Sequence, residues 1–529
     1  MNAVLLTDGY KLDHRRQYPN GTEKVYSNWT ARSNEYFPQA KDGVVVFGIQ
    51  YFIKKYLIDY FNSNFFKVEK DIAIKNFSRR INTFLGENQV GTKHIEELWD
   101  LGYLPVEIKA LPEGSICPIR VPMLTIVNTH PNFFWITNFL ETLMSCELWL
   151  PMTSATTARV YRKELERHAE KTGFPKDIEL GFLCHDFSMR GMAGLEASVT
   201  SGMGHLTSFI GSETIPAIDA CEEYYNIDAE REIIAATVPA TEHSVICAGG
   251  MEDEFGTFKR LLTEIYPKGF LSIVSDTWDL WKVVTDYVPR LKDTILNRDG
   301  RLVIRPDSGD PVDIICGVST DDICEVCGTK YYIKGFVSNG AQYQTDTYRS
   351  IKKNPSAYKH LILNEHQIKG VYECLYDIMG GCVNEKGYKI LDSHIGVIYG
   401  DSITIERQEE IYKRLEHKGF AATNLVLGIG SYTYQYKTRD SLGFAMKATW
   451  CRVNGEDKEI FKQPKTDSGM KNSLKGLIQV LQDDNGKYYA KDCVSTEEEQ
   501  NSCLETVFKD GKLVRVTTLS EIRKRLQNA

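Results

Sequence analysis

Short apolar segments recur along the chain, and each is followed by polar or glycine residues and then by a helix-like pattern. In the stretch after one of them, Leu280, Val284 and Val288 are spaced to share one face of a helix. Strands that alternate with helices are typical of βα units and a parallel sheet. The apolar segments with their polar ends are residues 181–191, 271–276, 301–309, 394–402 and 424–432.

This pattern predicts an α/β fold with an irregular, TIM-like barrel over residues 151–435. Residues 311–390 have mixed strand signals and look like an insertion into it. The flanks, 1–150 and 436–529, contain strand-like runs such as "KVYSNW" and "ETVFKDGKLV". Because chain ends commonly meet, we expect these two flanks to join into one mixed α/β sandwich domain.

The composition and net charge of the chain favour some classes of protein over others. The chain has 529 residues, of which 42% are hydrophobic and 25% charged, and its formal net charge is −8. These values are ordinary for a globular protein with a real core, and the acidic balance argues against a general nucleic-acid binder. An anionic substrate in a locally basic pocket stays compatible with them.

Neither a membrane segment nor a signal peptide is expected. No apolar run approaches the roughly 18 residues that cross a bilayer. The first residues, "MNAVLLTDGYKLDH", reach Asp8 too soon for a signal-peptide core. We therefore expect a cytoplasmic protein with no membrane partner.

The thirteen cysteines are scattered along the chain, so reduced thiols are the default expectation. Cys324 and Cys327 have the spacing of half a zinc site, but no matching second pair follows them. We predict no metal held by protein ligands.

The segment "VIRPDSGDP" ends an apolar strand in a cation and an anion, Arg305 and Asp307. Such a pair fits a phosphate with a sugar hydroxyl beside it. The alternative is a turn held by a salt bridge between the two residues.

Two further segments combine groups of different chemistry. "HDFSMRG" contains Asp186, Phe187 and Arg190, which suits a flat aromatic substrate that gains a phosphate, or else a structural turn with an Asp–Arg pair. In "PATEHSV", the Glu242 carboxylate could orient the His243 imidazole. Adjacent strand residues point to opposite faces, however, so an ordinary core or surface histidine is the competing interpretation.

The remaining strand ends are acidic or rich in glycine. Asp276 and Asp279 follow one strand, Gly400 and Asp401 another, and "GIGSY" (428–432) a third. Each aspartate could be a simple helix N-cap, and the glycine turn is a weak phosphate-binding motif. Their repetition at successive strand ends favours a shared site.

Together these segments resemble the nicotinamide phosphoribosyltransferases of the type II phosphoribosyltransferase family. The matching motifs occur in the family's order from residue 7 to about residue 525. They are "TDGYKLDHRRQYP", "PVEIKALPEGSICP", "HDFSMRG", "VPATEHS", "SIVSDTWD", "IRPDSG", "GDSI", "TRD" followed by "FAMK", and "ETVFKDGK".

The resemblance implies a reaction and its participants. Nicotinamide and phosphoribosyl pyrophosphate (PRPP) would give nicotinamide mononucleotide and pyrophosphate, as a step of NAD salvage. Mg²⁺ would accompany PRPP and pyrophosphate, and ATP would be a co-substrate that stimulates the reaction by phosphorylating His243. The enzyme would be a homodimer with active sites at the subunit interface.

The resemblance also assigns residues to roles. The nicotinamide ring would stack between Phe187 and Tyr10 of the other subunit. The residues implied in catalysis are His243, Asp307, Arg305 and Glu242. The groups implied to contact phosphates are Arg190 and Arg305, then Arg439 and Lys447 from the partner, and the backbone around Gly400, Gly430 and Ser431. Asp307 and Asp401 would bind ribose hydroxyls, and the other implied contacts are Asp186, Ser272 and Asp276.

Two positions depart from the family's animal members. Glu213 stands where they carry an aspartate that contacts the nicotinamide amide, and Ser431 and Tyr432 replace glycines. An anion at 213 accepts a hydrogen bond from an amide and repels a carboxylate, which favours nicotinamide over nicotinate. The alternatives are a nicotinate phosphoribosyltransferase of the same fold, a non-catalytic ligand sensor or extracellular signalling protein, and a barrel enzyme of unrelated chemistry.

Overall fold

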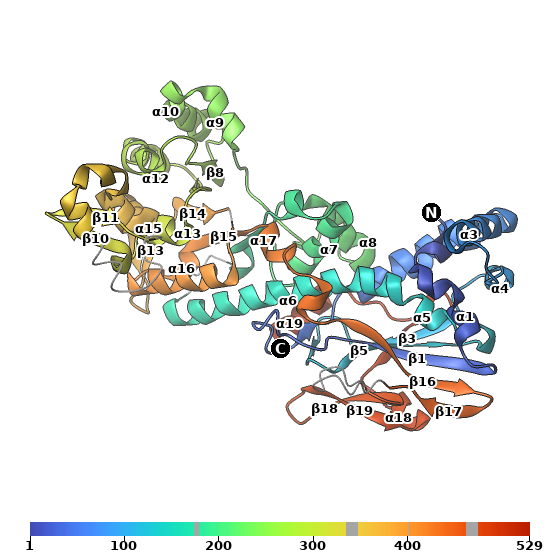
Figure 1. Ribbon diagram of the computed structural model, residues 1–529. Coiled ribbons are helices and arrows are strands. Elements are labelled where there is room, and N and C mark those ends of the chain that lie inside the picture. The colour runs from blue at the N-terminus through green and yellow to red at the C-terminus, as the bar shows by residue number, and fades with distance from the viewer. Residues whose placement is uncertain (174–178, 335–347, 401, 462–473) are drawn as a thin grey trace.

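The computed structural model describes residues 1–529 except 174–178, 335–347, 401 and 462–473. It contains two large sheets, one parallel and one antiparallel, with the long helix α6 (Glu141–Thr172) running between them (Figure 1). Within the described residues, no helix is both long enough and apolar enough to span a bilayer.

The parallel sheet has six strands in the order β7-β6-β15-β14-β9-β8, and every pair of neighbours is parallel. β8, with the sequence LSIV, is buried along its whole length, which is typical of strands covered on both faces. The strands are β6 (Cys184–Asp186), β7 (Gly211–Ser212), β8 (Leu271–Val274), β9 (Leu302–Arg305), β14 (Ile395–Tyr399) and β15 (Leu425–Ile429).

Residues 236–240 join the two edges of this sheet. Ala236 forms a parallel bridge with Gly211 next to β7, and Ala240 forms one with Ser272 in β8. The Ala236 amide donates to the carbonyl of Ile210 at 2.7 Å, and the Ser272 amide donates to that of Pro239 at 2.9 Å. The sheet is thereby closed by one short irregular segment, and the predicted irregular α/β barrel is confirmed.

Helices connect and cover the barrel strands. The predicted helical face after β8 is present, with Leu280, Val284 and Val288 all buried. α16 ends two residues before Gly419, whose φ of +77° is typical of the glycine that follows a helix. The helices around the barrel are α7 (Leu195–His205), α8 (Ile215–Tyr225), α9 (His243–Gly249), α10 (Glu254–Arg260), α11 (Leu280–Lys282), α12 (Val288–Leu296), α13 (Pro311–Cys316), α15 (Glu365–Met379), α16 (Ile405–His417) and α17 (Ser431–Tyr434).

The segment between β9 and β14 contains two small hairpins besides helices α13 and α15. One pairs β10 (Ile323–Val326) with β11 (Thr329–Tyr332), and the other pairs β12 (Gly381–Val383) with β13 (Lys389–Leu391). Cys327 lies in the tight turn of the first hairpin with a φ of +52°. The Cys-x-x-Cys spacing is therefore part of a β-hairpin.

The antiparallel sheet combines both ends of the chain, which the sequence predicts to join into one domain. β1 lies between β16 and β5, and β20 pairs with β3, in the order β17-β16-β1-β5-β3-β20-β21. The strands are β1 (Thr22–Thr30), β3 (Val106–Ala110), β5 (Pro122–Asn128), β16 (Ala445–Val453), β17 (Glu456–Glu459), β20 (Glu505–Lys509) and β21 (Lys512–Leu513). Helices α3 (Lys70–Leu85) and α4 (Lys93–Leu101) belong to the same part of the chain (Figure 1).

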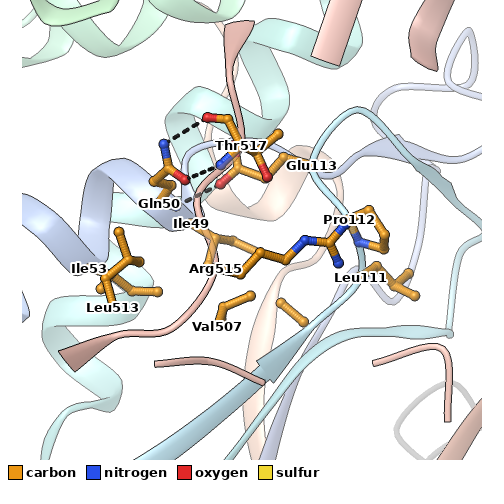
Figure 2. A pocket seen from close by; sticks show the side chains of 11 residues that line it. Ile49, Gln50, Ile53, Leu111, Pro112, Glu113, Val507, Leu513, Arg515 and Thr517 are labelled. Atoms are coloured by element: carbon orange, nitrogen blue, oxygen red, sulfur yellow. Dashed lines mark hydrogen bonds between the residues drawn. The ribbon is translucent and has the colours of Figure 1, made fainter. Parts of the chain in front are cut away.

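The last helix, α19 (Leu519–Gln527), is tied to the N-terminal part of the chain by a buried polar cluster (Figure 2). The Gln50 side chain accepts from the Thr517 amide at 2.7 Å and donates to the Thr517 carbonyl at 2.9 Å. The carboxylate of Glu113 accepts from the amides of Gln50 at 2.6 Å and Gly48 at 3.3 Å. The expected boundary at residue 150/151 falls inside α6, which packs against both parts of the protein.

Candidate active site

The carboxyl ends of the six parallel strands meet at one rim of the barrel, and most of the predicted site residues lie there. Arg305 is the last residue of β9, and Asp276 comes two residues after β8. Phe187 and Glu213 directly follow β6 and β7, and Gly400 directly follows β14. In α/β barrels this rim is where active sites are built.

The ends of β8 and β9 bring a cation and two carboxylates together. The Asp276 carboxylate accepts from the Asp307 amide at 3.0 Å and from the Ser308 hydroxyl. Arg305 Nε lies 3.5 Å from an Asp307 carboxylate oxygen, and Arg305 Nη2 donates to the Thr241 carbonyl at 2.5 Å. The salt-bridged turn is thus present, and it forms part of a larger charged cluster at the rim.

His243 is the first residue of α9, and its side chain is half exposed. Its Nδ1 lies 3.1 Å from the hydroxyl of Thr277, and its Nε2 lies 3.8 Å from Asp276 Oδ1. That Asp276 oxygen is buried and has no hydrogen-bond partner among the described residues. The imidazole is therefore held over the charged cluster with one nitrogen facing a carboxylate.

The expected pairing of Glu242 with His243 is wrong. Glu242 is the N-cap residue of α9, and its carboxylate accepts from the Ser244 hydroxyl. Because α9 begins at His243, the two side chains leave the backbone in different directions, and Asp276 takes the place expected for Glu242.

The ends of β6, β7 and β15 form a second group around Phe187. Its ring lies 5.0 Å from that of His185, and its amide donates to the Ile429 carbonyl at 2.8 Å. A Cβ added to Gly428 would come within 2.7 Å of the Phe187 ring and of the Gly400 Cα. Glycine at 428 is what lets an aromatic ring lie flat against the end of β15.

Glu213 is fixed beside this ring by two side chains. His185 Nε2 lies 3.1 Å from Glu213 Oε1, and the Thr237 hydroxyl donates to the same oxygen. Burial by itself would raise the pKa of Glu213, but the contacts with His185 and Thr237 outweigh it and hold the pKa below its ordinary value. The carboxylate therefore stays ionised at neutral pH.

Two predicted binding residues do not reach the surface of the rim. The Asp186 carboxylate is fully buried and accepts from the Ser188 amide at 2.9 Å and the Thr214 hydroxyl at 2.8 Å, so it holds the turn after β6. The Ser272 hydroxyl is also buried, inside β8, and has no hydrogen-bond partner in the described part of the chain. Asp401 lies outside the described residues.

Arg190 and Ser431 come from turns that touch each other. Arg190 is exposed in the turn at Met189–Gly191, and a Cβ on Gly191 would lie 2.2 Å from Ser431 Oγ. Ser431 begins α17 directly after Gly430, where an added Cβ would meet nothing within 4 Å. The predicted phosphate-contacting groups of these two turns are thus adjacent.

The remaining three predicted residues lie on the other side of the molecule. Tyr10, which is 64% exposed, and Arg439 line a hollow of about 280 Å³, and Tyr10 and Lys447 line a neighbouring hollow of about 430 Å³. Tyr10 lies in the 3-10 helix Gly9–Asp13, which directly precedes α1 (His14–Gln17), and α1 lies at the opposite end of the molecule from β8 and β14 (Figure 1). These residues do not meet the rim of their own chain.

Sequence comparison decides the family. A model of the nicotinate phosphoribosyltransferase (NAPRTase) family matches residues 182–512, which is more than half of the chain. This chain belongs to that family. A model of the N-terminal domain of nicotinamide phosphoribosyltransferase matches residues 2–108.

Curated relatives cover nearly the whole chain. The nicotinamide phosphoribosyltransferase of Acinetobacter baylyi is 46% identical over 99% of this chain and 97% of its own length. The enzyme of that name from Mycoplasma pneumoniae is 32% identical over 91% and 97%.

Two solved structures share the fold of this chain. A nicotinate-nucleotide pyrophosphorylase from Pyrococcus furiosus aligns with a TM-score of 0.52 at 15% identity, covering 99% of this chain and 94% of that one. Human nicotinic acid phosphoribosyltransferase aligns with a TM-score of 0.50 at 14% identity, covering 99% and 93%.

Three threonines of the site were not predicted. Thr237 holds Glu213, Thr241 accepts from Arg305 through its carbonyl, and Thr277 contacts His243. Threonine is common on strands and helix ends, so its residue type carried no chemical signal. Only their positions pointed towards the site: Thr241 lies inside "VPATEHS", Thr277 lies inside "SIVSDTWD", and Thr237 directly precedes "VPATEHS".

Proposed function

We propose that this chain acts as a nicotinamide phosphoribosyltransferase. It transfers the 5-phosphoribosyl group of PRPP to the ring nitrogen of nicotinamide and releases pyrophosphate, as a step of NAD salvage. The relatives of that name align over nearly the whole chain. The observation that carries the choice of pyridine is the ionised Glu213 carboxylate beside the ring of Phe187.

Glu213 distinguishes an amide from an acid. Its ionised carboxylate has no proton to donate and can only accept hydrogen bonds, and the NH₂ group of nicotinamide can donate one. The carboxylate of nicotinate would instead face a like charge, which costs binding free energy. His185 and Thr237 occupy one oxygen of Glu213, which leaves the other oxygen for the substrate.

The charged cluster suits the ribosyl donor. The pyridine nitrogen has a free lone pair, so the reaction needs no general base to activate it. The protein must hold the partners in line and stabilise the charge that develops on pyrophosphate. Arg305, with Arg190, would contact phosphate, and Asp307 would accept from ribose hydroxyls; Asp401 is the other residue that we propose for the ribose.

Mg²⁺ would bind at this cluster together with the phosphates of the substrate. It prefers oxygen ligands, keeps several waters, and is commonly held by one or two carboxylates together with substrate phosphates. Asp276 Oδ1 is buried without a hydrogen-bond partner among the described residues, next to Asp307. These two carboxylates would hold the ion together with the pyrophosphate oxygens, which differs from the expectation that no protein side chain binds a metal.

His243 would accept a phosphoryl group from ATP. A neutral imidazole nitrogen is a good nucleophile near pH 7. Nδ1 lies against the Thr277 hydroxyl, while Nε2 faces the rim 3.8 Å from Asp276. Phosphorylation of Nε2 would put additional negative charge beside the Mg²⁺-binding carboxylates and so strengthen metal-dependent substrate binding.

The working enzyme would be a homodimer. Tyr10, Arg439 and Lys447 gather on one exposed surface at a distance from the rim of their own chain. A second copy that placed this surface against the rim would set Tyr10 opposite Phe187 and add two cations for phosphate. All thirteen cysteines are free thiols, which is typical of a reducing compartment, so we place the reaction in the cytoplasm.

One experiment tests the function directly. The protein is incubated with labelled nicotinamide or labelled nicotinate, PRPP and Mg²⁺, with and without ATP, and the mononucleotide is measured. Nicotinamide mononucleotide as the main product supports the proposal. Faster turnover of nicotinate would instead favour nicotinate phosphoribosyltransferase, the activity after which the family model over residues 182–512 is named.

A further inference from the structure

A large hollow outside the active site has an unusual charge. It has a volume of about 980 Å³ and lies where α6, α19, residues 41–42 and 114–118, and the turn between β18 (Leu477–Gln482) and β19 (Tyr488–Val494) meet. We call it the basic hollow, because its wall contains two acidic side chains, Asp42 and Glu521, but six basic ones. The basic residues are Lys41, Arg159, Lys163, Lys487, Lys524 and Arg525.

The two acids of the basic hollow are already engaged. Asp42 lies 2.8 Å from Lys163 and 3.6 Å from Arg159, so one carboxylate serves two cations. Glu521 accepts from the Thr518 amide at 2.8 Å and caps the start of α19. Six basic and two acidic side chains leave the wall with a net side-chain charge of +4.

Three lysines in the wall have no acidic partner among the described residues. Lys41, Lys487 and Lys524 make no ion pair with the described part of the chain, although the chain as a whole carries a net charge of −8. They come from three segments far apart in the sequence, so the fold and not local sequence brings them together. Cations that line one hollow repel one another, and an anion bound among them would relieve that repulsion.

Arg159 is a buried, charged residue in the wall of the hollow. Only 9% of this residue is exposed, its Nη2 donates to a main-chain carboxyl oxygen of Ala529 at 3.0 Å, and its Nε has no acceptor among the described residues. Burial lowers the pKa of Arg159 even though Asp42 lies nearby. A buried guanidinium with an incomplete set of acceptors is a group that an anion in the hollow would stabilise.

We propose that the basic hollow is a second ligand site, separate from the barrel rim, that binds a small phosphorylated anion. Its volume fits a molecule of metabolite size, and several cations around one concave surface suit two or more adjacent phosphates. The ligand would bridge α6, α19 and the β18–β19 turn. A long polyanion such as a nucleic acid is disfavoured by the chain's net charge of −8.

Inorganic triphosphate is the probe, and calorimetry measures its binding without Mg²⁺. The experiment uses Arg305→Ala as background, so that the rim contributes little to the signal. In this background the variant Lys41→Ala/Lys487→Ala/Lys524→Ala is compared with Lys75→Ala/Lys259→Ala/Lys353→Ala, which removes three exposed lysines elsewhere. Both triple variants change the net charge by the same amount.

We expect the control variant to bind triphosphate as the background does, and the hollow variant to bind about a hundredfold more weakly. In the chain that retains Arg305, the hollow variant should keep its transferase activity, since no rim group is altered. A loss smaller than about tenfold relative to the control, or no binding of triphosphate to Arg305→Ala at all, would overturn the proposal.

Discussion

The buried carboxyl group of Glu113 should make the stability of this protein depend on pH. Burial raises the pKa of Glu113 from its ordinary 4.5 to about 7, although the amide of Gln50, which lies beside it in Figure 2, and the hydroxyl of Tyr225 donate to it. The folded state therefore keeps this proton to a higher pH than the unfolded state does. The free energy of unfolding must fall as the pH rises from 4.5 through 7.

The size of the effect follows from the two pKa values. A separation of this size amounts to about 3 kcal/mol, of which about 2.5 kcal/mol is lost between pH 5 and pH 8. At about 2.1 cal/mol/K for each of the 529 residues, that loss lowers Tm by about 2 °C if the chain unfolds as one unit. The shift is larger if the mixed domain unfolds alone.

The substitution Glu113→Gln removes the proton-binding group and keeps one oxygen for the Gln50 amide. Its new NH₂ group faces the Gly48 amide, which adds a cost that does not depend on pH. The informative quantity is therefore the Tm difference between variant and wild type at pH 5 and at pH 8, measured by scanning calorimetry. The variant should gain about 2 °C on the wild type between the two.

The matched control is Glu385→Gln, at an exposed glutamate. Its Tm difference from the wild type should stay constant between pH 5 and pH 8, since an exposed carboxyl group gains little from being neutral. If Glu113→Gln gives an equally constant difference, or one that moves in the opposite direction, the reasoning about this buried carboxyl group is refuted.

Three further predictions concern the active site. His243→Ala should lose ATP hydrolysis and ATP stimulation and keep part of the transferase activity; undiminished stimulation rules out the phosphate-acceptor role. Glu213→Gln should lower the preference for nicotinamide over nicotinate, measured as the ratio of kcat/KM values, by about tenfold, and an unchanged ratio contradicts its role in selection. Gly428→Ala should reduce kcat/KM by about tenfold or more because its Cβ would displace Phe187, whereas Gly430→Ala adds a methyl in open space and should cost less; equal losses contradict the steric argument.

The barrel rim could be predicted because the strands that form it are easily recognised in the sequence. Apolar runs such as Leu271–Val274 are buried on both faces, and each ends abruptly in charged or glycine residues. Parallel pairing then puts all those ends at one edge, so Arg305, Asp307 and Asp276 could be expected together. That the two chain ends join into one mixed α/β domain was likewise predicted, because chain termini commonly meet, but not that they share one sheet.

The sequence did not predict the segment that closes the barrel or the partners within the site. Residues 236–240, "ATVPA", contain no apolar run, and their place in the sheet is set by the edges of β7 and β8. The failed pairing of Glu242 with His243 has a related cause. The start of a helix at residue 243 depends on where the closing segment ends, and tertiary contacts determine that position.

The contact between Arg305 and the Thr241 carbonyl has a consequence for how the site responds to its donor substrate. Arg305 holds the segment that closes the barrel, which leads within three residues from Ala240 to His243. Arg305 has further N–H groups, among them Nε, that remain available for a phosphate while Nη2 donates to Thr241. A phosphoryl group bound by Arg305 would therefore be joined through one side chain to the segment that carries His243, so donor binding and imidazole position are coupled.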